Sequence, residues 1–115
     1  LGVIYFGGSE YSMIEALDYL NSEGILLDSM RIRSFPFNDE VDNFITSHDL
    51  VFVVEQNRDA QMKKLLLAES KANISSDKLT PVLCFDGMPI TADFISSEII
   101  KFLSEKKIKE ILNKK

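Results

Sequence analysis

Residues 55–59 form the densest group of chemically competent side chains in this sequence. Carboxylate, amide and guanidinium groups follow one another directly after the most apolar run, residues 50–54. Arg58 can pair with a carboxylate within this group or with Asp86. Loops at the edge of a rigid sheet often carry recognition, so the group is either a recognition or docking loop or a locally satisfied polar loop. Its candidate residues are Glu55, Gln56, Asn57, Arg58 and Asp59.

Nucleophilic chemistry would have to come from Ser9, His48 or Cys84. Ser9 is expected to follow the first strand and His48 to precede the third, which places them at opposite edges of a parallel sheet, about 17 Å apart. His48 is therefore interpreted as a last-turn residue that complements a helix C-terminus. Cys84 is the only cysteine and falls in an apolar run, so we expect an inert core residue and no disulfide, iron–sulfur cluster or cysteine-based zinc site.

Gly7 and Gly8 stand where a nucleotide-binding loop would follow the first strand. The dinucleotide fingerprint G-x-G-x-x-G needs a third glycine and a spacing that this sequence lacks, and Glu10 would repel a pyrophosphate. A phospho-acceptor (receiver) domain is also unsupported, because Gly7 replaces the first carboxylates that would hold Mg²⁺ and only Glu55 remains. The glycines are interpreted as a tight turn. We expect no catalytic, cofactor-binding or metal-ligating residue here. A second turn is expected at Asp86 and Gly87.

Apolar runs and helix-capping residues predict the elements that hold these loops. Short apolar runs rich in β-branched residues predict buried strands. Apolar residues at helical spacing after a capping residue predict amphipathic helices, and Gly24 is expected to end the first of them. The basic tail 106–115 is expected to fray. The predicted strands are 2–6, 26–32, 50–54 and 79–85, and the predicted helices follow Ser9, Asn38, residue 59 and Thr91.

Strands that alternate with helices predict an α/β fold, a three-layer α/β/α domain with a mainly parallel sheet and right-handed crossovers. The first and third strands are the most apolar and are therefore placed in the centre, while Pro81 indicates that the fourth strand lies at an edge. The predicted strand order is 2-1-3-4. Loops 7–9 and 55–58 would then flank one crevice at the carboxyl edge, where the strand order reverses.

Composition limits the class of protein. The chain has 115 residues, of which 45% are hydrophobic and 27% charged, as expected for one globular domain spanning 1–115. Its net charge of −5 argues against nucleic-acid binding. No apolar run reaches the ~20 residues of a membrane helix and no signal peptide is recognised, so a cytoplasmic protein without membrane contact is expected. The chain opens at Leu1 without an initiator methionine, which we interpret as a boundary within a larger subunit.

Four separated motifs resemble one family, in the same order and over essentially the whole chain. Residues 53–61, VVEQNRDAQ, resemble the segment V-V-E-Q-N-R-D-G-Q in alpha-type subunits of 2-oxoacid:ferredoxin oxidoreductases, above all the 2-oxoglutarate type. Residues 31–37 resemble the family's R-x-R-x-x-P-F strand end, residues 5–9 its Y-G-S-type turn, and residues 85–92 its D-G-x-P-x-T-A turn. Ala60 stands where the family often has glycine.

The resemblance implies a place in the transketolase C-terminal-like domain of the alpha subunit. This domain has a three-layer α/β/α fold, often with one extra antiparallel strand, which would precede Leu1. The family's complexes use thiamine diphosphate, Mg²⁺ and iron–sulfur clusters to convert a 2-oxo acid and coenzyme A to acyl-CoA and CO₂, and they reduce ferredoxin. The resemblance therefore implies as partners the other domains of the same subunit and partner subunits, with ferredoxin and CoA at the level of the complex.

Residues that the family's chemistry needs are missing from this sequence. It has no G-D-G…N-N element for diphosphate and Mg²⁺, and the glutamate that activates the thiamine ring belongs to a different domain of the family. The fragment by itself is therefore expected to be catalytically silent. Turnover by the isolated chain would revive the possibility that it carries its own activity.

Two functions remain open. The first is a structural and docking domain, in which Arg31 and Arg33 share a facing at a strand end and present charge to a neighbouring domain or subunit. Solvation or local pairing of the two arginines is an equal alternative. The second function is a free-standing small-ligand-binding or regulatory module, with a small cationic or amide-bearing ligand in the crevice between residues 7–9 and 55–58.

Overall fold

A four-stranded parallel sheet forms the centre of the computed structural model, which describes residues 1–6, 10–32, 39–55, 60–69, 74–83 and 91–113. Each neighbouring pair of strands is parallel, and the order is β2-β1-β3-β4. The predicted order and the position of the fourth strand at an edge are therefore confirmed. The strands are β1 (Gly2–Phe6), β2 (Asp28–Ile32), β3 (Val51–Glu55) and β4 (Leu79–Leu83).

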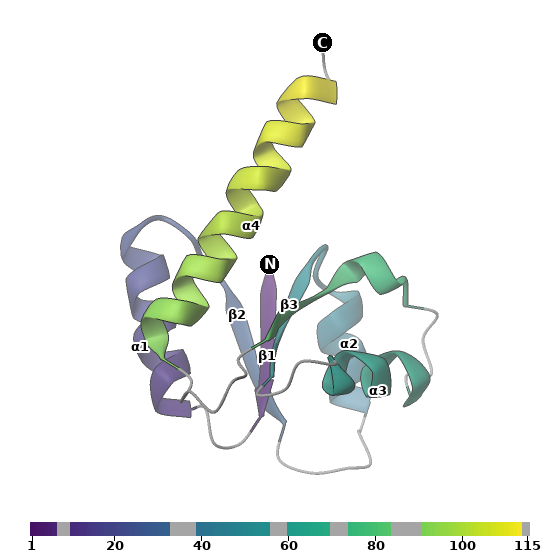
Figure 1. Cartoon of the computed structure of the whole chain (residues 1–115). Coiled ribbons are helices and arrows are strands. Elements are labelled where there is room, and N and C mark those ends of the chain that lie inside the picture. The colour runs from purple at the N-terminus through teal and green to yellow at the C-terminus, as the bar shows by residue number, and fades with distance from the viewer. Residues whose placement is uncertain (7–9, 33–38, 56–59, 70–73, 84–90, 114–115) are drawn as a thin grey trace.

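Helices cover both faces of this sheet and complete the three predicted layers (Figure 1). One face carries the first and last helices and the other face carries the middle two, together with a short 3₁₀ turn, Ser76–Lys78. The helices are α1 (Glu10–Ser22), α2 (Asp39–Thr46), α3 (Gln61–Glu69) and α4 (Ala92–Asn113).

Two apolar clusters hold the layers together, one on each face of the sheet. β3 contributes to both clusters because its residues are buried along the whole strand, as expected for a central parallel strand. On the α1/α4 face, Phe52 and Phe102 meet edge to face with ring centroids 5.6 Å apart. On the α2/α3 face, fully buried Ile4 and Ile45 pack in the second cluster.

Gly24 lies in the turn that terminates α1, as the sequence predicts. Its φ of +84° is the left-handed conformation that glycine adopts without steric cost. The Ile25 N–H donates to the Leu20 carbonyl at 2.9 Å and the Gly24 N–H donates to Asn21 at 3.0 Å, the Schellman pair that satisfies carbonyls at a helix end. This turn delays the second strand, which begins at Asp28 and not at the predicted residue 26.

The structure corrects two further predicted boundaries. β3 continues to Glu55, which pairs with Leu83 in the sheet, whereas the sequence placed Glu55 as the first residue of a loop. α4 continues to Asn113, whereas residues 106–115 were expected to fray. Lys, Glu and Leu are frequent at the end of α4, and all three are good helix formers.

Candidate functional site

The structure places two of the predicted site residues, Arg31 in β2 and Glu55 at the end of β3. It therefore describes the strands on which the predicted crevice would stand, but not the loops that would form it. Cys84 lies outside the described residues. So do the other predicted site and turn residues, which are Gly7, Gly8, Arg33, Gln56, Asn57, Arg58, Asp59, Asp86 and Gly87.

Glu55 is a buried carboxylate that holds the beginning of α3. Its side chain is only 4% exposed, and its two oxygens accept the backbone N–H groups of Met62 at 2.5 Å and Lys63 at 3.1 Å. These N–H groups belong to the first turn of the helix, where no intrahelical acceptor exists and the helix dipole favours negative charge. Glu55 therefore fixes the position of α3 against the carboxyl end of β3.

Ala60 adopts a backbone conformation that glycine tolerates better than alanine does. Its φ is +51°, in the left-handed region that alanine enters only at a steric cost. Its carbonyl accepts the Lys64 N–H at 3.0 Å, so the strained residue also begins the helical hydrogen bonding of α3. This strained residue lies directly before the helix that Glu55 caps.

Arg31 lies within β2 and is half-buried. It is paired with Tyr5 of β1 in the parallel register, so the two side chains share the sheet face that α1 and α4 cover. The sequence predicts that Arg31 and Arg33 lie on the same side of the strand. The structure places the first of them on this covered face, and the second lies outside the described residues.

A second polar cluster lies at the opposite, amino edge of the sheet. His48 follows α2, and its Nδ1 lies 2.6 Å from the Phe44 carbonyl, which confirms its predicted place at a helix C-terminus. Its Nε2 lies 2.7 Å from the Asp28 carboxylate at the start of β2, a partner that the sequence did not predict. The cluster joins α2 to β2 at the amino edge, whereas Ser9, the predicted nucleophile position, lies outside the described residues.

Gly2 allows the Phe44 and His48 rings to pack closely against the backbone in this cluster. A Cβ at position 2 would lie 3.0 Å from the Phe44 ring and 3.2 Å from the His48 ring. The two rings pack at a centroid distance of 4.5 Å. The Gly2 N–H also donates to the Leu50 carbonyl at 2.9 Å. The amino edge is therefore closely packed around His48, which indicates a structural role.

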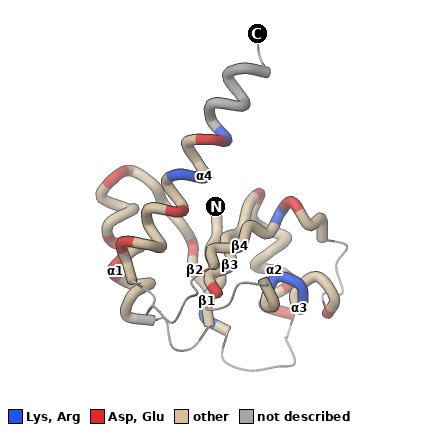
Figure 2. Tube along the Cα trace, viewed as in Figure 1, with Lys and Arg blue, Asp and Glu red and all other residues tan. Residues whose placement is uncertain are grey.

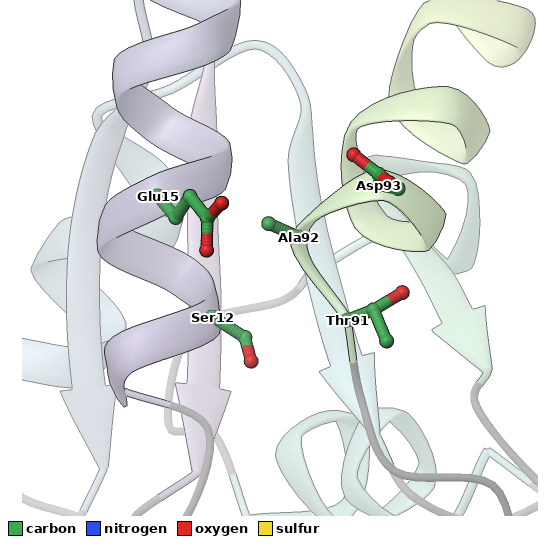
Figure 3. A pocket seen from close by; sticks show the side chains of 5 residues that line it. All are labelled: Ser12, Glu15, Thr91, Ala92 and Asp93. Atoms are coloured by element: carbon green, nitrogen blue, oxygen red, sulfur yellow. The ribbon is translucent and has the colours of Figure 1, made fainter.

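A shallow hollow of about 260 Å³ lies between the beginnings of α1 and α4 (Figure 3). Thr91 caps α4, since its hydroxyl oxygen accepts the Phe94 N–H at 3.2 Å. Among the described lining residues, the other polar groups are one hydroxyl and two carboxyl groups, and none is basic. The described lining residues are Ser12, Glu15, Thr91, Ala92 and Asp93.

The described residues do not fit the diphosphate of thiamine diphosphate. Glu15 and Asp93 would repel a phosphate in the hollow, and the carboxylate of Glu55 already accepts two backbone N–H groups. Within the described part of the chain, no three His, Cys, Asp or Glu side chains gather in a metal-binding group. No described helix is both long and apolar enough to cross a membrane.

Comparison with known proteins gives a likeness in structure but none in sequence alone. No family model matches the chain, and no curated protein matches it. A solved structure of 2-oxoglutarate:ferredoxin oxidoreductase from Magnetococcus marinus, with 2-oxoglutarate, coenzyme A and succinyl-CoA bound, superimposes with a TM-score of 0.74 and 24% identity. The alpha chain of a probable 2-oxoacid ferredoxin oxidoreductase from Thermoplasma acidophilum superimposes with a TM-score of 0.55 and 24% identity.

The chain has the fold of a domain found in 2-oxoacid:ferredoxin oxidoreductases.

This likeness covers most of the chain but unequal shares of the two oxidoreductases. The first superposition covers 87% of this chain and 17% of the Magnetococcus chain. The second covers 90% of this chain and 88% of the Thermoplasma chain. The fold predicted from the four motifs is therefore confirmed, with the strand order 2-1-3-4 and helices on both sheet faces.

Proposed function

We propose that this chain is a structural and docking domain of a thiamine diphosphate-dependent 2-oxoacid:ferredoxin oxidoreductase, most specifically the 2-oxoglutarate type. The parent enzyme would convert a 2-oxo acid and CoA to acyl-CoA and CO₂ and reduce ferredoxin in the cytoplasm. In this proposal thiamine diphosphate, Mg²⁺ and iron–sulfur clusters are bound elsewhere in the complex. The domain contributes surfaces that contact the rest of its subunit and the partner subunits.

One observation carries the proposal: the superposition on the 2-oxoglutarate:ferredoxin oxidoreductase, with a TM-score of 0.74 over 87% of this chain. Two of the four motifs that resemble the oxidoreductase alpha subunit contain described residues that hold the sheet and α3 in place. One includes Glu55, which holds α3, and Ala60, whose left-handed backbone suits the family's glycine. The other includes Arg31 in β2.

In this function Glu55 and α3 form the rigid base of the docking loop. Glu55 fixes one side of the loop through its bonds to Met62 and Lys63, and Ala60 fixes the other side. Residues 56–59 connect these two fixed points and carry the polar groups proposed to contact the neighbouring domain. A rigid base lowers the entropy that a docking loop loses on binding.

The test replaces Arg58 with alanine in the full-length subunit, co-expressed with its partner subunits. Removal of a guanidinium from a desolvated contact is expected to weaken assembly by about tenfold or more, because the opposing carboxylate is left unpaired. Lys64→Ala, an exposed position on α3, is the control and should assemble normally. Assembly and turnover are measured on the purified complex. Normal assembly and turnover of the Arg58 variant would remove Arg58 from the docking role.

The crevice predicted for the alternative, a free-standing small-ligand-binding or regulatory module, has its loops outside the described residues, but the hollow between α1 and α4 is a second place where such a ligand could bind. Its carboxyl and hydroxyl lining suits a small cationic ligand. A thermal-shift screen of the chain against polyamines and amino-acid amides tests this function, because a ligand that binds the folded state raises the melting temperature. A shift that disappears in Glu15→Gln and Asp93→Asn variants would favour the module over the docking domain.

A further inference from the structure

α1 presents exposed apolar side chains on the side that faces away from the sheet. Tyr11 is 88% exposed, and Ile14 and Tyr19 are each 51% exposed. Met13 and Leu20, which lie on the opposite side of the helix, are fully buried in the core. Single exposed apolar residues are ordinary, but three large ones on one side of one helix form a patch of the kind that marks a protein contact.

Exposed carboxylates lie between these apolar side chains. Helical spacing places Glu15 one turn from both Tyr11 and Tyr19. Asp18 lies one turn beyond Ile14 in the same way. We call these five residues the α1 face. It combines two aromatic rings and one aliphatic side chain with two negative charges.

Negative charge extends beyond the α1 face. Residues 1–30 contain no lysine or arginine, and Figure 2 shows acidic residues but no basic residue along α1. α1 packs beside α4, whose first turn carries the exposed Asp93. Glu15 and Asp93 both line the hollow between the two helices (Figure 3). A surface that is both apolar and negative is complementary to one that is apolar and positive.

We propose that the α1 face docks a basic, partly apolar protein segment of the parent oxidoreductase. Lys or Arg side chains of this segment pair with Glu15 and Asp18. Its apolar side chains cover Tyr11, Ile14 and Tyr19, and the tyrosine rings are buried while their hydroxyl groups keep hydrogen-bond partners at the rim. The inference rests on the proposed docking role, and it adds to the carboxyl-edge loop a second surface whose partner has a stated chemistry.

The charge of the α1 face selects this occupant over two others. A two-fold contact between two copies of the face would bring Glu15 and Asp18 against the same carboxylates of the second copy, where like charges repel. A small cation would pair with the carboxylates but leave Tyr11 and Ile14 in contact with water. A protein segment that carries both cationic and apolar side chains satisfies the whole face.

Hydroxyl-radical footprinting read by mass spectrometry tests whether the α1 face is covered in the complex. The full-length subunit, co-expressed with its partner subunits, is compared with the isolated 115-residue chain. Oxidation of Tyr11 and Tyr19 is expected to fall severalfold in the complex. Tyr5, which is only 8% exposed, is the internal reference and should react weakly in both samples. Unchanged oxidation of Tyr11 and Tyr19 in an assembled complex would overturn the proposal.

Charge reversal tests the chemistry of the partner. Glu15→Lys with Asp18→Lys should weaken assembly by about tenfold or more, because cationic side chains would then face cationic side chains. Glu69→Lys with Asp77→Lys is the matched control, since it makes the same change in net charge at exposed positions on the opposite side of the sheet. The melting temperature of each variant checks that it folds. Equal losses in the two double variants would reject a specific basic partner.

Serine substitutions test the apolar part of the contact. Tyr11→Ser with Ile14→Ser should also weaken assembly by about tenfold or more, because large side chains buried at the centre of an interface contribute most of its affinity. Leu26→Ser, at an exposed position beyond the carboxyl end of α1, is the control and should assemble normally. If the isolated chain forms a dimer that the double serine substitution abolishes, the occupant is a second copy and the proposal is wrong.

The same complexes separate this inference from the proposed function. Normal assembly of the α1-face variants, together with impaired assembly of the Arg58→Ala variant, would retain the docking role and reject the α1 contact. A wild-type subunit that forms no complex with its partner subunits would overturn the docking role, and the α1 contact with it.

Discussion

At the scale of single residues, Glu55 shows how one side chain connects two elements. It is buried, and its oxygens are the acceptors for two N–H groups at the beginning of α3. The wild-type arrangement satisfies these N–H groups, because the carboxylate replaces the water that would otherwise bind them. The same residue ends β3, so its substitution acts on the strand and the helix together.

We predict that Glu55→Ala destabilises the chain by about 2–3 kcal/mol, because two partly buried N–H groups lose their acceptor. Glu55→Gln keeps one oxygen acceptor but places an amide donor beside the other N–H, so it should lose most of the same stability. Glu69→Ala, at the exposed end of α3, is the control and should change stability by less than about 0.5 kcal/mol. Urea unfolding followed by circular dichroism gives these values. Equal effects at positions 55 and 69 would contradict the capping role.

We predict that Ala60→Gly is neutral or stabilises the chain by up to about 1 kcal/mol. Relief of the left-handed strain favours the folded state, while the greater freedom of glycine in the unfolded state partly offsets this gain. Ala68→Gly, at an exposed helical position in α3, should instead destabilise by about 1 kcal/mol. Thermal unfolding of both variants checks the difference in sign. A similar loss at both positions would mean that residue 60 is not strained.

At the scale of elements, the turn after α1 sets where β2 begins. Gly24 in its left-handed conformation allows Ile25 to bond back to Leu20, and the chain then enters β2 at Asp28. Asp28 is in turn the partner of His48, so the position of the turn decides whether the two can meet. One helix end on one face of the sheet thus controls a polar contact at the amino edge.

We predict that Gly24→Ala destabilises the chain by about 1 kcal/mol, the cost of placing an alanine at a positive φ. No other atom lies within 4 Å of a Cβ at this position, so the whole effect comes from the backbone. Gly24→Asn should recover part of the loss, because asparagine tolerates the left-handed region. Urea unfolding midpoints measure both variants. A Gly24→Ala chain as stable as the wild type would contradict a required positive φ.

At the scale of the whole molecule, the two edges of the sheet differ. The carboxyl edge holds the loop proposed to dock, whereas the amino edge is closed by the cluster of His48, Asp28 and Gly2. Substitution of Arg58 therefore tests the carboxyl edge, through assembly with partner subunits.

The apolar pattern of the sequence by itself determined the fold of this protein. Two runs buried on both faces had to be central strands, Pro81 had to lie at an edge, and alternation with helices required a parallel sheet. These are local properties, because burial and proline chemistry act residue by residue. The four motifs likewise indicated the fold that the superposition on the oxidoreductase shows.

Only the tertiary structure decided which polar groups meet. Glu55 was expected to be the first residue of a polar loop, yet it ends a strand and caps α3. Asp28 and His48 lie 20 residues apart, and no sequence spacing predicts their contact. Both contacts depend on the parallel stacking of elements, which brings distant strand ends to a common edge. A hydrogen bond requires atoms within about 3 Å, a precision that hydrophobic periodicity does not contain.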